Sequence, residues 1–230
     1  MSDSFADFGM GDGDSGLGKK NVRFDPEAGK TYVLSFVWYR EYGTDGVPNL
    51  TKGLRYTSCE RIYKEGLGYV LYKGPAYADF GKPKTAIATI IALWPSDGKG
   101  NADMARLSEV QIMPWMFSPD KYEILSRAND KFALIKHDIA VTCTDSKFKK
   151  ISITPDNKCV IDMLRHSDKP GAATLLKTIY QSVANVASNI RNDLARDLSL
   201  DEIREKLNLE VSGPTNRTSR DADSLLDDIV

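Results

Sequence analysis

The hydrophobic period of this chain changes after Pro170, and this change constrains its fold more than any other feature. Before it, short β-branched and aromatic segments separated by turn-forming residues predict strands. The predicted strands are 31–39, 54–63, 69–73, 85–94, 109–116, 137–144 and 148–154. After Pro170, apolar residues recur at spacings of three and four, which predicts an amphipathic helix of about 24 residues.

Two further helices are indicated by their start signals. Ser118 and Pro119 are typical of an N-cap and a first helical position, so a helix is expected from there to about Ala128. Ser199 and Glu202 form a capping box that opens a shorter helix. The fold class we expect is mainly β with helices: an oligonucleotide-binding (OB) fold-like five-stranded barrel with an internal helix, a C-terminal helical extension and disordered acidic termini.

The expected domain organisation follows from composition. Residues 1–20 are rich in Gly, Ser and Asp, which predicts a disordered acidic N-terminus. Residues 21–166 are expected to form the OB-fold-like core, and 167–210 the C-terminal helices. Residues 211–230 are polar and rich in helix breakers, so they are expected to form a flexible acidic tail.

Charge is sorted along the chain. The formal net charge is −1, yet residues 19–166 hold 23 Lys and Arg against 17 Asp and Glu, while both ends are acidic. A basic body attracts polyanions, and a tethered acidic tail can occupy the same surface when the polyanion is absent. Deleting the tail is therefore expected to tighten polyanion binding.

Several classes of protein are disfavoured. No apolar run approaches the roughly 18 residues of a membrane helix, and the N-terminus lacks the basic and apolar regions of a secretory signal, so a soluble intracellular protein is expected. Cys59, Cys143 and Cys159 are widely spaced, which predicts reduced thiols and no zinc cluster.

The sequence gives little support to an enzyme. His137 and His166 are the two histidines, and neither has a nucleophile at a recognisable spacing. Residues 11–16 match the G-x-G-x-x-G pattern, but no strand precedes them and their aspartates would repel a pyrophosphate. No catalytic residue, cofactor or metal ligand is expected, and a nuclease, which needs clustered carboxylates, is a distant alternative.

Aromatic residues and cations alternate in the N-terminal half. Residues 31–94 hold 12 of the 21 aromatic residues of the chain. Rings offer bases a surface to stack on while neighbouring cations contact phosphates, so a groove for single strands is expected here. The candidate DNA-binding residues are Trp38, Tyr39, Arg40, Lys52, Arg55, Tyr56, Arg61, Tyr63, Lys64, Tyr69, Tyr72, Lys73, Tyr77, Phe80, Lys82, Lys84 and Trp94. The alternative for each is a core ring or a solvated cation.

The last ten residues alternate carboxylates with aliphatic side chains. This pattern is typical of a peptide that docks into a hydrophobic pocket with a basic rim, although a solubility tail is the alternative. The candidate partner-binding residues are Asp221, Asp223, Leu225, Leu226, Asp227, Asp228, Ile229 and Val230.

Three segments suggest a family: TAIATIIALWP from Thr85, SPDKYEILSRAND from Ser118 and HDIAVTCTDSKFKKISITP from His137. They resemble the core of the bacteriophage single-stranded-DNA-binding (helix-destabilising) proteins of the T-even type, and the similarity extends through the C-terminal helices to the acidic tail. The resemblance implies an OB fold and capture of single strands without sequence specificity during DNA replication, recombination and repair. It also implies recruitment of replication and recombination proteins by the tail, and a location in the host-cell cytoplasm.

Two departures from that family change the expectations. The T-even type binds structural zinc through a His and Cys cluster, but the corresponding region here offers Cys59 without a nearby histidine, so the zinc is expected to be absent. The family self-associates through a basic N-terminal arm, whereas this chain is acidic up to Lys19, which leaves self-association on DNA open.

The function expected from these observations is non-enzymatic binding of single-stranded DNA, which protects and extends the strand. The alternative is an accessory factor of replication or transcription that binds another protein and makes no direct contact with nucleic acid. Tryptophan quenching by an oligonucleotide would distinguish the two. A preference for DNA or RNA is left open by the residues.

Overall fold

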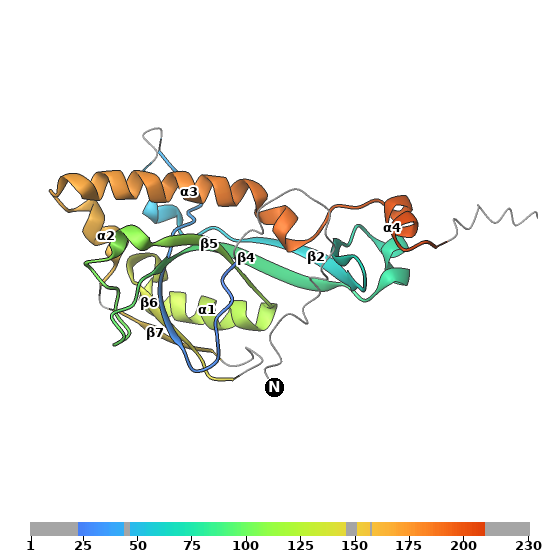
Figure 1. The fold of residues 1–230 in the computed structure, drawn as a ribbon, viewed down its shortest axis with the longest axis horizontal. Coiled ribbons are helices and arrows are strands. Elements are labelled where there is room, and N and C mark those ends of the chain that lie inside the picture. Colours follow the sequence, from blue (N-terminus) through green and yellow to red (C-terminus); the bar gives the residue numbers. More distant parts are fainter. Residues whose placement is uncertain (1–22, 44–46, 146–150, 157, 210–230) are drawn as a thin grey trace, which may run out of the picture. The chain divides into compact units, whose positions relative to one another are not determined.

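The computed structural model describes residues 23–43, 47–145, 151–156 and 158–209. Contacts divide the chain into two units, 1–197 and 198–230. The first unit holds all the described strands and the longest helices (Figure 1).

Seven strands form one sheet within the described residues. They are β1 (Thr31–Phe36), β2 (Thr57–Lys64), β3 (Gly68–Leu71), β4 (Lys84–Trp94), β5 (Gln111–Phe117), β6 (Ile139–Cys143) and β7 (Ile151–Pro155). Their order is β3-β2-β4-β1-β6-β7, with β5 paired to β4, and each of these pairs is antiparallel. The sequence-based strand predictions are confirmed in kind, including the closing hairpin of β6 and β7.

The central strand is β4, which has 11 residues. One of its edges pairs with β5, and the other is shared by β2 near its start and β1 near its end. A strand that is buried on both faces of a sheet needs a nearly continuous run of apolar residues, and TAIATIIALW supplies one. The strongest strand prediction from the sequence therefore becomes the centre of the sheet.

The sheet is open, so the expected five-stranded OB barrel is not confirmed. The outer edge of β3 is occupied by the chain that follows the longest helix: the Leu71 N–H donates to the Arg196 carbonyl, and the Arg196 N–H donates to the Tyr69 carbonyl, both at 2.9 Å. At β5, the Phe24 N–H donates to the Pro114 carbonyl over 3.0 Å. Irregular segments therefore hydrogen-bond to two of the outer strands, β3 and β5, while β7 ends the other side of the sheet.

Three helices pack on the sheet: α1 (Pro119–Phe132), α2 (Val160–Arg165) and α3 (Pro170–Leu194). Figure 1 shows α3 on one side of the sheet and α1 on the other. The helices predicted from Ser118 and Pro170 are confirmed. The short α2 was not predicted from the sequence, because its 6 residues are too few for a helical period to be recognised.

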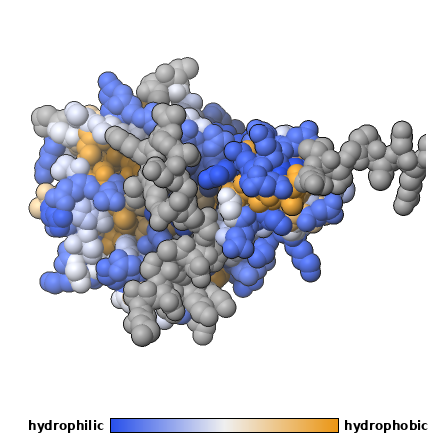
Figure 2. All heavy atoms as spheres, turned by 45° about the vertical axis from the view of Figure 1, so that its right-hand side comes forward, coloured by the Kyte–Doolittle hydropathy of each residue, from blue (hydrophilic) through white to orange (hydrophobic). Residues whose placement is uncertain are grey.

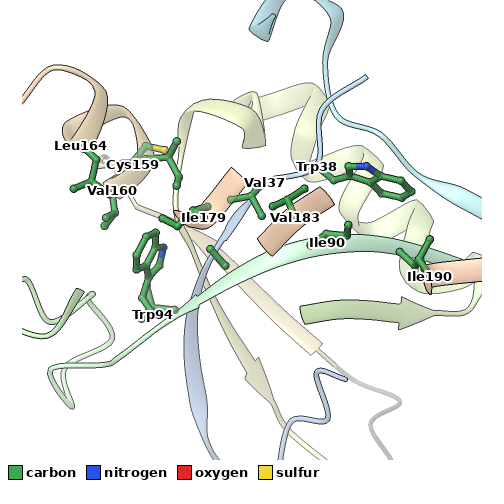
Figure 3. Packing of buried hydrophobic residues seen from close by; sticks show 14 of the residues in the cluster. Val37, Trp38, Ile90, Trp94, Cys159, Val160, Leu164, Ile179, Val183 and Ile190 are labelled. Carbon is green, nitrogen blue, oxygen red and sulfur yellow. The ribbon is translucent and has the colours of Figure 1, made fainter. Parts of the chain in front are cut away.

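Each face of the sheet has its own hydrophobic core. The core under α2 and α3 includes Trp38, Trp94, Ile179 and Val183, several of which Figure 3 displays. The core on the face of α1 includes Tyr39, Trp115 and Leu125. The apolar stripe predicted for the long helix is thus confirmed as its buried face.

In the second unit the described helix is α4 (Leu200–Lys206). Its capping box is formed as expected, because the Ser199 side chain accepts from the Glu202 N–H while the Glu202 carboxylate accepts from the Ser199 N–H. The predictions for the N-terminus 1–20 and the tail 211–230, with all its partner-binding candidates, lie outside the described residues. No helix within the described part is long and apolar enough to cross a membrane.

Candidate functional site

Five of the predicted stacking rings are buried: Trp38, Tyr39, Tyr77, Phe80 and Trp94, each at most 8% exposed. The expectation that these rings are open to a nucleotide is therefore wrong. Trp38 and Trp94 belong to the core under α2 and α3, and Tyr39 to the core on the face of α1. Tyr77 and Phe80 are buried in the 3-10 helix Pro75–Phe80.

Trp94 belongs to a buried polar network. Its Nε1–H donates to Ser35 Oγ at 2.7 Å, and the Ser35 hydroxyl donates to the Asp138 carboxylate. That carboxylate also accepts the Val160 N–H at 2.9 Å, which fixes the first residue of α2. Burial raises the pKa of Asp138 to about 6, against the opposing effect of its hydrogen bonds to Ser35 and Val160. Trp94 is thus a structural residue.

Tyr56, like Tyr39, lies on the α1 face of the sheet. Its ring contacts Phe117 and Tyr122 edge-to-face, with centroids 6.3 and 5.2 Å away. Burial raises the pKa of Tyr56. Because Tyr56 and Trp38 pack in the cores of opposite faces, the single groove expected from residues 31–94 is not assembled.

A smaller set of candidates meets on the hairpin of β2 and β3. Tyr63 and Tyr69 are directly opposite each other across the hairpin, with ring centroids 5.4 Å apart, and Tyr63 is 44% exposed. The Arg61 guanidinium lies over the Tyr69 ring at 3.7 Å from its centroid. We call Arg61, Tyr63, Tyr69 and Lys84 the hairpin surface.

The hairpin surface continues the sheet face that α3 covers. Arg61 is the cross-strand partner of Lys84, and the alternate residues of β4 from Lys84 to Trp94 point to the α3 side. Helix α3 ends at Leu194, whose carbonyl accepts from Arg61 Nη1 at 2.7 Å. Beyond Leu194, α3 no longer covers the sheet, so the Tyr63 ring and the Lys84 side chain are exposed on the same face.

Two further arginines lie near this surface. Burial lowers the pKa of Arg61, and Arg23 is close enough for its positive charge to act in the same direction. Arg191 lies near enough to lower the pKa of Cys59, although burial raises that pKa more strongly. Glu60 lies next to Arg61 in sequence and therefore points to the opposite face of β2.

Gly81 allows the chain after the hairpin to return against it. Its φ of 153° is unfavourable for other residues, and a Cβ there would lie 3.3 Å from the Tyr63 carbonyl oxygen. The short 3-10 helix Pro75–Phe80 can thus end beside β2 and lead into β4 at Lys84.

The remaining cations are dispersed or paired. Lys82 is exposed before β4, and Lys64 is half-buried at the end of β2. Arg40 donates through Nε to the Leu54 carbonyl at 3.0 Å. Lys52 lies 3.9 Å from the Glu41 carboxylate, and Lys73 pairs with Asp197. The half-buried Tyr72 contacts Tyr77 edge-to-face at 6.5 Å.

A groove lies beside α3 and has a volume of about 1010 Å³. We call it the α3 groove. Its lining residues are Trp38, Tyr42, Val47, Arg55, Arg165, Ala173, Leu176, Lys177, Tyr180, Gln181, Val183, Ala184 and Ala187. Two of these, Trp38 and Arg55, were DNA-binding candidates, and the Arg55 guanidinium lies 5.0 Å from the centroid of the Trp38 ring.

Sequence reasoning missed Arg165, Lys177 and Tyr180 as lining residues of a site. The available signal was Tyr180, a tyrosine that interrupts the aliphatic stripe of the long helix. Its hydroxyl accepts from Arg165 Nε and Nη2 at 3.2 and 3.0 Å, and burial raises its pKa despite this bond. The pairing of Arg165 with Tyr180 depends on α2, which the sequence did not reveal.

Other titratable groups have local partners. His137 Nδ1 lies 2.8 Å from the Asp156 carbonyl oxygen, and His166 Nδ1 lies 2.9 Å from that of Asp162. All three cysteines are free thiols. Among the described residues, no group of three or more His, Cys, Asp or Glu side chains is placed to hold a metal ion.

No protein-family model matches the chain, and no curated protein matches it.

Proposed function

We propose that the protein binds single-stranded DNA without sequence specificity and that the hairpin surface is its principal contact. The observation that carries the proposal is the grouping of an exposed ring, Tyr63, with Arg61 and Lys84 on one uncovered sheet face. A base can stack on the exposed ring while the cations contact the flanking phosphates.

The hairpin surface supports sequence-tolerant capture. Every base has a flat face, so stacking on Tyr63 does not select among bases, and Arg61 and Lys84 contact the backbone that all strands share. Hydrophilic residues predominate on the molecular face in Figure 2, which suits a surface that meets a solvated polyanion. A duplex keeps its bases stacked on one another and gains less from the ring.

The effect of such binding is thermodynamic. A protein that binds unpaired strands more tightly than duplex lowers the free energy of the open state by mass action. We propose that the chain thereby protects and extends single strands during replication, recombination and repair. In this proposal the open sheet is a variant of the OB-type platform, and the acidic residues 221–230 recruit other proteins of those processes.

The test is a fluorescence titration of the full chain with poly-dT, poly-U and duplex DNA at several chloride concentrations. We expect poly-dT to bind more tightly than duplex. The logarithm of affinity should fall with the logarithm of salt concentration with a slope of about −0.7 for each phosphate contacted. A binding constant indifferent to salt, or equal for duplex and single strand, would refute the proposal.

A second candidate function is protein binding, and the α3 groove favours it. The groove is concave and lined largely by apolar side chains, whereas the hairpin surface is open. A protein that only binds another protein would show no response to poly-dT in the same titration.

A further inference from the structure

The α3 groove presents one stripe of the long helix. Ala173, Leu176, Tyr180, Ala184 and Ala187 line it, and their spacings of three and four place them on the same side of α3. The stripe from Ala173 to Ala187 is about 21 Å long at 1.5 Å per residue. Small side chains, Ala173 at one end and Ala184 and Ala187 at the other, allow another chain to approach the helix closely.

The groove is also positively charged on several sides. Arg55 comes from the segment that precedes β2, Arg165 from the last position of α2 and Lys177 from α3. No Asp or Glu is among the described residues that line it. The salt bridges of the described residues do not include Arg55, Arg165 or Lys177. An occupant that brings carboxylates would add ion pairs to the contacts that Arg55 and Arg165 already make with Trp38 and Tyr180.

The rings of this groove are poorly placed to stack on bases. Trp38 is 5% exposed, and the Arg55 guanidinium already lies over it. Tyr42 and Tyr180 contact each other edge-to-face with centroids 6.3 Å apart. The Tyr42 hydroxyl donates to the Val37 carbonyl at 3.2 Å, so this ring is held in place. Aliphatic surface, including Val47 at 50% exposure, is what the groove offers instead.

We propose that the α3 groove binds an acidic amphipathic segment of a partner protein. Aliphatic side chains of the segment lie against Val47 and Leu176, and its carboxylates pair with the surrounding arginines and lysine. This site is separate from the hairpin surface, so it does not depend on DNA binding.

Two synthetic peptides of about 14 residues, the length of the helix stripe, serve as probes. Both carry leucine at helical spacing; one has glutamate at the other positions and the second has glutamine. Fluorescence anisotropy with the full chain measures their affinities. We expect the glutamate peptide to bind at least about tenfold more tightly, and K177Q to reduce that preference.

Ala184→Glu is the blocking variant, because it places bulk and negative charge in the groove. Thr178→Glu is the matched control: it adds the same charge to an exposed position of α3 that does not line the groove. We expect A184E to weaken glutamate-peptide binding by about tenfold or more and T178E to leave it nearly unchanged. Oligo-dT affinity should be the same in both variants.

Four results would overturn the proposal. Equal binding of the glutamate and glutamine peptides would show that charge complementarity plays no part. Absence of any binding would show that the groove does not hold such a segment. Equal effects of A184E and T178E would place the peptide elsewhere. Displacement of the peptide by oligo-dT, together with loss of oligo-dT affinity in A184E, would assign the groove to nucleic acid instead.

Discussion

Trp94 and Tyr63 point to the same side of one sheet but have different roles. Trp94 ends β4 beneath α2 and α3, is 3% exposed and donates to Ser35. Tyr63 lies on β2 beyond the end of α3, is 44% exposed and contacts Tyr69. The residue types are similar, and the difference between them is the helix that covers one and not the other.

This contrast teaches that coverage of the sheet by a helix, rather than residue type, decides which aromatic residues of this sheet are accessible to a ligand. In the covered region a ring contributes to folding, because its burial removes apolar surface from water. In the uncovered region the same kind of ring contributes little to folding and remains available for stacking. Four experiments can break or sharpen this distinction.

The largest effect is expected from Trp94→Ala. Removing a buried ring costs about 3–5 kcal/mol of unfolding free energy, and here the Ser35 hydroxyl also loses a donor. The matched change, Tyr63→Ala, should cost under about 1 kcal/mol because a cross-strand surface pair is worth little more. Urea unfolding of both variants measures the difference. Equal losses of stability would erase the distinction between the two regions.

The covered region should also respond to pH through Asp138. The folded pKa of this carboxyl is about 6, above its ordinary value of 3.8. The folded state therefore holds the proton more tightly, and the stability that this provides at acid pH is lost as the pH rises from about 4 to about 6. At 1.36 kcal/mol per pKa unit the loss is about 3 kcal/mol.

The measurement is urea unfolding of wild type and Asp138→Asn from about pH 4 to pH 7, the window set by the shifted pKa. Wild-type stability, relative to that of the variant, should decline across this interval and level off above it. Parallel pH profiles would show that Asp138 does not titrate in the folded protein as its burial implies.

In the uncovered region, Tyr63→Leu should weaken binding of oligo-dT by about 1–3 kcal/mol if the ring stacks on a base. Tyr63→Phe keeps the ring and should bind nearly as well as wild type. Fluorescence titration at fixed salt separates the two variants. If both bind with wild-type affinity, Tyr63 is not a stacking residue.

The smallest effect is expected from Lys84→Gln, which under the proposed function removes one phosphate contact. Affinity should decrease modestly, and the slope of log affinity against log salt should become shallower by about 0.7. Lys131→Gln, at an exposed position on α1, is the control that removes the same charge elsewhere. Identical salt slopes for both variants would exclude Lys84 from the contact.

Local patterns in the sequence predict the elements of this fold well. The apolar run of β4, the Ser118-Pro119 helix start and the spacing of residues along α3 each depend on near neighbours in the chain. Whether the sheet closes into a barrel depends instead on contacts between segments that are distant in the chain. The segments around Arg196 and Phe24 hydrogen-bond to β3 and β5, and their sequences carry no pattern that marks them as partners of edge strands.

The candidate site was predicted only in part for a related reason. Alternation in β2 places Arg61 and Tyr63 on one face, but it does not tell where α3 stops covering that face. The α3 groove brings together residues that are far apart in the sequence, such as Arg55 and Tyr180. Such a site exists only after packing, so a pattern of nearby residues could not have indicated it.

The position of β4 between three partner strands has a consequence for local opening. Around Ala88 and Ile91 both edges of β4 are hydrogen-bonded, to β5 on one side and to β2 or β1 on the other. Separating any one partner leaves the strand held by another, so its amide hydrogens exchange with solvent only when most of the sheet opens. The strand thereby makes the covered and uncovered regions one cooperative unit. Under the proposed function, a bound DNA that stabilises the hairpin would also slow the opening of the core behind it.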